Sequence, residues 1–182
     1  MNPESDRRKR FEAIAEEVFE PLQRYLRRRA HPADADDALS EVLLTVWRRL
    51  DKAPEELPLP WCYGIARRVL ANQRRGRHRH IKLVQKMGSQ PNSSVVPDPA
   101  NAGADADLEA ALGQLSENDR EVLRLWAWEQ LEPREMAPVL GVSVNAATLR
   151  LSRARRRLAG SLTGQNHPGS GHESVEGTQG TR

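Results

Sequence analysis

The side chains best able to do chemistry in this chain are arginines, and a dense group of them follows a short turn within residues 131–158. This stretch reads LEPREMAPVLGVSVNAATLRLSRARRRL. Pro133 suits the first turn of a helix because its missing N–H would have no partner there, and Gly141 can adopt the left-handed conformation that ends a helix. Ser143 is expected to cap the next helix with its side-chain oxygen. The pattern predicts a helix-turn-helix whose second helix carries the arginines.

The second helix of this pair has two different faces. Residues at intervals of four and three positions form an apolar face that can pack on the rest of the domain, namely Ala147, Leu151, Ala154 and Leu158. The other face can enter a DNA major groove, unless the helix is an ordinary amphipathic one with a hydrated arginine face. The candidates for contacts to base edges lie in its N-terminal half and are Asn145, Thr148, Leu149 and Ser152. The candidates for phosphate contacts are Arg150, Arg153 and Arg156.

A second group of cations occupies a span that contains no acidic residue between Gly64 and Gln90. The histidines His78 and His80 lie among its basic side chains, which are Arg67, Arg68, Arg74, Arg75, Arg77, Arg79 and Lys82. Clustered cations can displace the counterions that condense on nucleic acid. The span therefore predicts a second nucleic-acid contact, and a basic surface or arm without a ligand is the alternative.

Acidic and histidine side chains could hold a metal ion, but their positions favour other roles. Asp34, Asp36 and Asp37 follow Pro32, where carboxylates face the positive end of a helix dipole. No glycine-rich phosphate loop or pair of histidines with metal-ligand spacing accompanies them. The histidines of the C-terminal tail would need further ligands at fixed spacing to bind a metal. We therefore expect no metal, no cofactor and no enzymatic activity.

The remaining composition limits the class of protein. The single cysteine, Cys62, excludes an internal disulfide and a multi-cysteine zinc site, and it is expected to be a small core residue. No apolar run approaches the roughly 20 residues that span a bilayer. The first residues, MNPESDRRKR, are not followed by the apolar stretch of a signal peptide. We therefore expect a soluble, cytoplasmic protein that makes no membrane contact.

Apolar residues with helical spacing place these groups on an all-α scaffold. Apolar stripes within residues 11–26, 39–50 and 61–70 predict three helices in the N-terminal half. Pro21 is expected to kink or interrupt the first of them. The proline-rich stretch 51–60 is expected to form a loop. No part of the chain shows the sustained alternation of a β-strand.

Composition divides the chain into two small helical domains. With 182 residues, 38% of them hydrophobic, the chain suits two modest cores better than one large one. The predicted domains span residues 8–83 and 107–162. Residues 84–106 between them are rich in proline, serine and asparagine and are expected to form a flexible linker. Residues 163–182, rich in glycine and serine, are expected to form a disordered tail.

Three stretches, in this order and spacing, resemble an extracytoplasmic-function (ECF) sigma factor of bacterial RNA polymerase, within the sigma-70 superfamily. They are DADDALSEVLLTVWRRL (34–50), WCYGIARRVLANQRR (61–75) and LSENDREVLRLWAWEQLEPREMAPVLGVSVNAATLRLSRARRRL (115–158). The resemblance implies that the first stretch docks on the clamp helices of the largest polymerase subunit. It implies that the second reads and melts the minus 10 promoter element and that the third reads the minus 35 element.

The resemblance also implies partners and contact residues. Core RNA polymerase, including its clamp helices and flap region, and promoter DNA are the expected partners, and dedicated anti-sigma factors are common in the family. Contacts with core polymerase fall on the exposed side of the second helix, on Asp37, Ser40 and Glu41. The candidates for the minus 10 contacts are Tyr63, Arg67, Asn72, Arg74 and Arg75.

Several residues depart from the usual pattern of the family. Ser40 stands in place of a glutamine, Arg68 in place of an asparagine and Asn72 in place of an aspartate. Pro138 lacks the N–H of a mid-helix residue, so the first helix of the helix-turn-helix is expected to be bent or shortened. Where lysine and serine usually follow the buried valine, the chain has Thr148 and Leu149. These last two predict a distinct minus 35 sequence or a weaker contact with it.

Other DNA-binding proteins share part of this pattern. A helix-turn-helix regulator that binds DNA without joining the polymerase is the main alternative. The segment LSENDREVLRL also resembles the DNA-binding domain of LuxR-type response regulators. Such a regulator should carry an α/β receiver domain, whereas this sequence lacks alternating strands.

Overall fold

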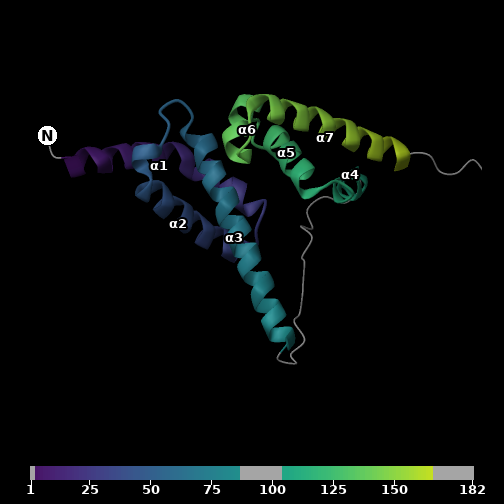
Figure 1. Cartoon of the computed structure of the whole chain (residues 1–182), viewed down its shortest axis with the longest axis horizontal. Coiled ribbons are helices and arrows are strands. Elements are labelled where there is room, and N and C mark those ends of the chain that lie inside the picture. The colour runs from purple at the N-terminus through teal and green to yellow at the C-terminus, as the bar shows by residue number, and fades with distance from the viewer. Residues whose placement is uncertain (1–2, 87–103, 166–182) are drawn as a thin grey trace, which may run out of the picture.

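The computed structural model describes residues 3–86 and 104–165, and all of the regular structure within these ranges is helical (Figure 1). The elements, in chain order, are α1 (Pro3–Arg27), α2 (Pro32–Arg48), the short 3-10 helix η1 (Leu50–Lys52), α3 (Pro58–Lys86), α4 (Ala104–Gly113), α5 (Glu117–Ala127), α6 (Pro133–Leu140) and α7 (Val144–Gln165). The all-α class predicted from the sequence is confirmed. Most of the expected linker and tail lies outside the described residues.

The N-terminal domain consists of α1, α2 and α3, which pack on one another along their apolar stripes. Val18 and Leu22 of α1 and Val42 and Val46 of α2 are fully buried, as their spacing predicts. Cys62 of α3 is also fully buried, in agreement with its expected role in the core. Burial of these side chains removes apolar surface from water, which is the dominant favourable contribution to folding.

Pro21 does not interrupt α1, which continues from Pro3 to Arg27. A proline inside a helix lacks one backbone hydrogen bond and usually weakens the helix. Here Val18 on one side of Pro21 and Leu22 and Tyr25 on the other are all fully buried. Packing of these residues against α2 and α3 holds both halves of α1 in place, and this tertiary packing outweighs the local effect of the proline.

Helix α3 is longer than its apolar stripe. It begins at Pro58, inside the expected loop, where prolines are tolerated because first-turn N–H groups have no helical partner. It then runs through the basic span to Lys86. Its C-terminal half projects away from α1 and α2 (Figure 1). The arginines of the span are therefore carried on a helix that extends beyond the apolar core.

The C-terminal domain contains the expected helix-turn-helix. The side-chain oxygen of Ser116 accepts a hydrogen bond from the Asp119 N–H at 3.1 Å and caps α5. Gly141 ends α6 in the left-handed conformation, at φ 67°. Ser143 accepts a hydrogen bond from the Ala146 N–H at 3.3 Å at the start of α7. The roles predicted for Gly141 and Ser143 are confirmed, and α6, which contains Pro138, is only eight residues long.

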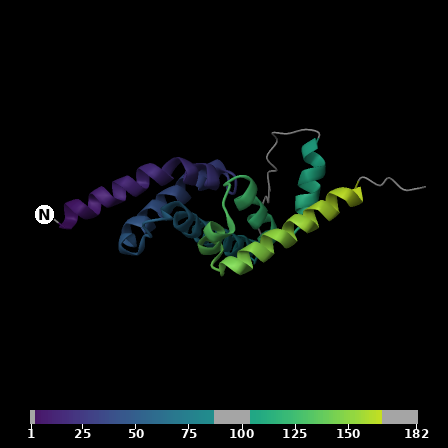
Figure 2. The same ribbon diagram turned by 90° about the horizontal axis from the view of Figure 1, so that it is seen from above.

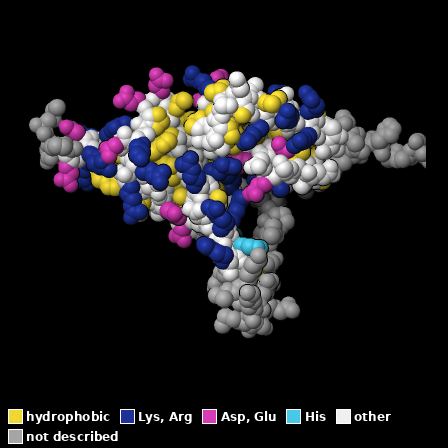
Figure 3. Space-filling model, viewed as in Figure 1, with side chains coloured by type: hydrophobic (Ala, Val, Ile, Leu, Met, Phe, Trp, Pro, Cys, Tyr) yellow, Lys and Arg dark blue, Asp and Glu magenta, His cyan; other side chains and the backbone are white. Residues whose placement is uncertain are grey.

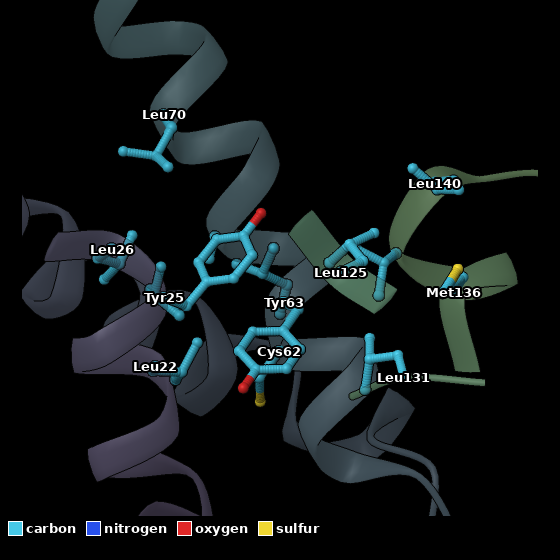
Figure 4. Close-up of a cluster of buried hydrophobic side chains, with 14 of the residues drawn as sticks. Leu22, Tyr25, Leu26, Cys62, Tyr63, Leu70, Leu125, Leu131, Met136 and Leu140 are labelled. Atoms are coloured by element: carbon cyan, nitrogen blue, oxygen red, sulfur yellow. The ribbon is translucent and has the colours of Figure 1, made fainter. Parts of the chain in front are cut away.

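The two domains meet along α1, α3, α5 and α6, and their apolar residues form one continuous cluster. Tyr25 of α1 and Tyr63 of α3 stack with their ring centroids 4.7 Å apart, and Leu125 and Leu131 of the C-terminal domain lie beside them (Figure 4). The two modest cores expected from composition are thus joined at this point. Seen from above, α1 and α7 extend toward opposite ends of the molecule (Figure 2).

Within the described residues, no helix combines the length and the apolar character needed to cross a membrane. Over the same ranges, no group of three or more histidine, cysteine, aspartate or glutamate side chains is arranged to hold a metal ion.

Candidate nucleic-acid interface

The side chains expected to contact core polymerase form an exposed ridge on α2. Asp37, Ser40 and Glu41 all face solvent, whereas the neighbouring residues Leu39 and Val42 turn inward. The Ser40 hydroxyl donates a hydrogen bond to the Asp36 carbonyl oxygen at 3.2 Å. The two carboxylates are four residues apart on one helix and therefore lie on the same side of it. The ridge presents negative charge that a basic partner could bind.

The minus 10 candidates lie in different surroundings along α3. Tyr63 is only 2% exposed, and burial raises the pKa of its hydroxyl, with Glu129 adding to the effect. In this arrangement its ring packs on Tyr25 and is not presented to a DNA strand. Arg67, one turn further along, is half-buried. The sequence placed Tyr63 on or near the promoter side, whereas the structure buries this residue with Tyr25 of α1 stacked on its ring.

Further along α3, Asn72, Arg74 and Arg75 are exposed. Arg75 donates a hydrogen bond to the side-chain oxygen of Asn72 at 2.6 Å, which orders both side chains on one turn. Arg74 forms an ion pair with Glu117 of α5. Figure 3 shows dark blue basic side chains where this helix leaves the apolar core. This side of α3 is therefore basic, as the sequence predicts. One of its arginines, Arg74, is paired with a residue of the C-terminal domain.

Helix α7 has a buried apolar face and an exposed polar face, as the sequence predicts. Ala147, Leu151 and Ala154 are buried. The base-edge candidates Asn145, Thr148, Leu149 and Ser152 are exposed, as are the phosphate candidates Arg150, Arg153 and Arg156. The Thr148 hydroxyl donates a hydrogen bond to the Val144 carbonyl oxygen at 3.0 Å, which fixes its rotamer and leaves its oxygen able to accept. These residues form one continuous polar surface along the exposed side of α7.

A cluster of charged residues between the domains is not predicted by the sequence. The side chain of Arg29, just beyond α1, is 2% exposed and lies between Glu121 of α5 and Glu129 of the following loop. Its Nε is 3.1 Å from Glu121 Oε2, and its Nη1 is 2.8 Å from Glu129 Oε1. The Tyr25 hydroxyl donates to Glu121 at 3.0 Å, and Arg28 Nη1 lies 3.2 Å from Glu129 Oε2. We name Tyr25, Arg28, Arg29, Glu121 and Glu129 the interdomain charge cluster.

Electrostatics in this cluster favour the charged form of its central arginine. Burial lowers the pKa of Arg29, but Tyr25 and the carboxylate of Glu121 act in the opposite direction, so its pKa is raised overall. Burial raises the pKa of Tyr25, and the nearby Glu121 raises it further. The Arg29 guanidinium also lies 3.7 Å from the centroid of the Tyr25 ring. Because the two glutamates lie about a hundred residues away in the chain, no local spacing could have revealed the cluster.

Family descriptions match both domains. Residues 14–80 match sigma-70 region 2, and residues 105–158 match sigma-70 region 4. The ECF RNA polymerase sigma factor SigL of Mycobacterium tuberculosis is 30% identical over 151 residues, which cover 80% of this chain and 85% of SigL. The RNA polymerase sigma-E factor of Streptomyces coelicolor is 32% identical, over 74% of this chain and 75% of its own length. The chain spans only 34% of RfaY, a probable sigma factor of Xanthomonas campestris that is 30% identical to it.

Two solved structures share the fold. The sigma factor RpoE, in complex with the anti-sigma factor NepR from Bartonella quintana, has a TM-score of 0.61 at 23% identity and covers 84% of this chain and 96% of its own. CnrH, in complex with the cytosolic domain of CnrY, has a TM-score of 0.57 at 24% identity and covers 86% of this chain and 89% of its own. With both sigma-70 regions matched in order and SigL covered over most of its length, the chain belongs to the ECF sigma factors of RNA polymerase.

Proposed function

We propose that this sigma factor binds core RNA polymerase through the exposed ridge of α2 and brings it to promoters through α3 and α7. The family acts in promoter-specific transcription initiation. The observation that carries the proposal is the presence of three separate exposed surfaces, one acidic on α2 and two rich in arginine on α3 and α7. A carboxylate ridge suits a basic protein surface, and arginine-rich helix faces suit DNA phosphates.

Each domain has its own part in this proposal. Residues 8–83 would contact the clamp helices of the polymerase and the minus 10 element. Residues 107–162 would read the minus 35 element, with residues 84–106 connecting the two units. The flap region of the polymerase completes the set of core contacts that we propose.

Further aspects of the proposal follow from the family. Sigma factors are initiation factors rather than catalysts, and we propose that this chain has no enzymatic activity and acts in the cytoplasm together with the polymerase. RpoE of Bartonella quintana binds the anti-sigma factor NepR. By analogy, an anti-sigma factor belongs among the proposed partners of this chain.

Copurification with core RNA polymerase tests the proposal against a plain DNA-binding regulator. A tagged full-length chain is expected to retain the polymerase subunits on an affinity resin after a wash that removes nucleic acid. A regulator of the helix-turn-helix type would retain DNA only. Absence of polymerase from the eluate of a folded chain would refute the proposed role of α2.

The two exposed arginines on α3 are expected to contribute phosphate contacts. Replacing Arg74 and Arg75 by alanine should weaken holoenzyme binding to promoter DNA irrespective of sequence. Each lost phosphate contact should lower the slope of log affinity against log salt by about one unit. The measurement is a salt titration of promoter binding. Arg48 and Arg49, two exposed arginines that are also next to each other in sequence, are replaced by alanine as the matched control. An equal change of slope in the two double variants would mean that Arg74 and Arg75 make no specific contribution to the DNA interface.

The polar face of α7 is expected to set the minus 35 preference. The double variant Asn145→Ala, Thr148→Ala should prefer a different minus 35 sequence, because a lost bidentate contact to a base costs about 1–3 kcal/mol of discrimination. Arg153→Ala, in contrast, should weaken binding to all sequences alike. Binding selection from a randomised minus 35 library distinguishes the two results. An unchanged preference in the double variant would contradict the base-reading role.

A further inference from the structure

We propose that Arg29, Arg120 and Arg124 form a binding site for a phosphate dianion, either free or as the phosphate monoester of a small molecule. We name these three residues the arginine site. None of them belongs to the surfaces proposed for core polymerase or promoter DNA, so the inference is independent of the proposed function. The site adds a small anion to partners that are otherwise macromolecules.

The arginine site lies where the end of α1 meets one side of α5. Arg120 and Arg124 are four residues apart on α5 and therefore lie on the same side of this helix. Both are half-buried. Glu121, the residue after Arg120, lies 3.1 Å from Arg29 Nε through its Oε2 atom, which brings the end of α1 to this part of α5. Arginines from both domains therefore meet here.

Each residue of the arginine site has a buried hydrogen-bond donor to spare. Arg29 Nη2, Arg120 Nε and Arg124 Nε are buried and have no hydrogen-bond partner within the part of the chain that the structure describes. Most buried polar side-chain atoms in folded proteins do have a partner. The Arg29 side chain is only 2% exposed, so its Nη2 atom is not in contact with bulk water. Three such donors suit an acceptor that supplies several oxygen atoms.

The carboxylates around the arginine site are already paired. The ion pairs are Glu117 with Arg74, Glu121 with Arg29, and Glu129 with both Arg28 and Arg29. Over residues 3–86 and 104–165, neither Arg120 nor Arg124 forms an ion pair. Five arginines thus accompany three glutamates, which leaves an excess of two positive charges.

Repulsion among these cations is visible at Arg124. Burial lowers the pKa of Arg124, and the charge of Arg29 lowers it further. Glu121 acts in the opposite direction, but Arg120 and Arg74 add to the lowering. The guanidinium groups therefore lie close enough to disfavour one another, and a bound anion would favour the charged form of all of them.

The charge and the donors of the arginine site match the chemistry of a phosphate monoester. Such a group carries a charge of about −1.5 to −2 at pH 7 and has three strong acceptor oxygens. Guanidinium groups bind phosphate through pairs of short, charge-assisted hydrogen bonds. A phosphodiester of a DNA backbone has one charge and is linked on two sides, so it suits neither the excess charge nor buried donors. The geometry therefore favours a small ligand over a nucleic acid.

Isothermal titration calorimetry on the full-length chain tests the proposal with three probes, namely glycerol phosphate, inorganic phosphate and dimethyl phosphate. We expect one site that binds glycerol phosphate or inorganic phosphate with a dissociation constant below about 1 mM. Dimethyl phosphate, a diester with a single charge, should bind at least about tenfold more weakly. Tighter binding of glycerol phosphate than of inorganic phosphate supports the site and identifies a phosphorylated small molecule as its ligand. Equal binding of the two supports the site and identifies free phosphate.

The double variant Arg120→Gln, Arg124→Gln should weaken the binding of the tighter probe at least about tenfold, because two charged donors are lost. Circular dichroism checks that the variant is folded. If it is not, the single variant Arg120→Gln takes its place, with an expected loss of about threefold or more.

The matched control is the double variant Arg134→Gln, Arg155→Gln, which changes the net charge by the same amount in the same domain. Both arginines are exposed. Arg155 lies 4.6 Å from the ring centroid of Trp126, much as Arg124 lies 5.5 Å from that of Trp128. The control therefore also removes a contact between an arginine and a tryptophan ring, and it should keep wild-type affinity for the probe.

Three results would overturn the arginine site. The first is the absence of saturable binding of either phosphate dianion to the folded wild-type chain. The second is binding of dimethyl phosphate as tight as that of glycerol phosphate. The third is an equal loss in the two double variants, because net charge alone would then attract the anion. The assay contains neither polymerase nor promoter, so failure of the proposed function would produce none of these results.

Discussion

The double variant Asp37→Arg, Glu41→Arg is expected to bind core RNA polymerase at least a hundredfold more weakly than the wild type. Both carboxylates are exposed on one side of α2, so the variant presents two positive charges to a clamp surface that is proposed to be basic. Like charges placed against each other at an interface cost several kcal/mol, and about 1.4 kcal/mol corresponds to a factor of ten in affinity. A titration of labelled chain with core polymerase measures the effect.

The matched control for this variant lies on α1. Glu12 and Glu16 are also exposed and four residues apart, and replacing both by arginine changes the net charge by the same amount. Glu12 pairs with Arg8 at 3.2 Å on the surface, where such pairs contribute little. The control should keep wild-type affinity for the polymerase. Equal losses in both double variants would show that total charge, and not the ridge of α2, controls binding.

The substitution Leu22→Ala is expected to lower the free energy of unfolding of the N-terminal domain by about 2–5 kcal/mol. Leu22 is fully buried between α1 and its neighbours, and removal of its side chain forfeits burial and leaves a cavity. Chemical denaturation followed by circular dichroism measures the loss. A shift in the midpoint of the unfolding transition, with an unchanged slope of the free energy of unfolding against denaturant concentration, would identify a change in stability rather than in the unfolded state.

Phe19 provides the comparison for Leu22 on the same helix. Its side chain is 42% exposed, so Phe19→Ala should change stability much less than Leu22→Ala even though it removes more atoms. If the two variants lost similar amounts of free energy of unfolding, the described packing of α1 would be incorrect.

The local features of this fold could be predicted because they depend on residues close in sequence. Gly141 and Ser143 end and begin helices for reasons of backbone conformation and capping that need only their neighbours. The faces of α7 follow from the spacing of Ala147 and Leu151, which are both buried as expected. The interruption expected at Pro21 as one of two possible effects is wrong for the opposite reason, since tertiary packing around Pro21 decides whether the helix continues.

The contact between the domains could not be predicted because its partners are far apart in the chain. Nothing near Arg29 in sequence distinguishes it from its exposed neighbour Arg27, and its partners Glu121 and Glu129 belong to the other domain. The surroundings of Tyr63 are also made by residues distant in sequence, namely Tyr25 of α1 and, nearby, Leu125 and Leu131 (Figure 4). Tyr63, which the sequence places on or near the promoter side, is thus buried because of its tertiary contacts, which the helix that carries it does not reveal by itself.

Run-off transcription is the most direct measurement of the central claim that this chain directs polymerase to promoters. Purified core polymerase is incubated with a pool of genomic promoter fragments, with the wild-type chain or with its Asp37→Arg, Glu41→Arg variant. The account predicts discrete transcripts that require the wild-type chain and disappear with the variant. The same transcripts with and without the chain, under conditions where the chain binds the DNA by itself, would contradict it.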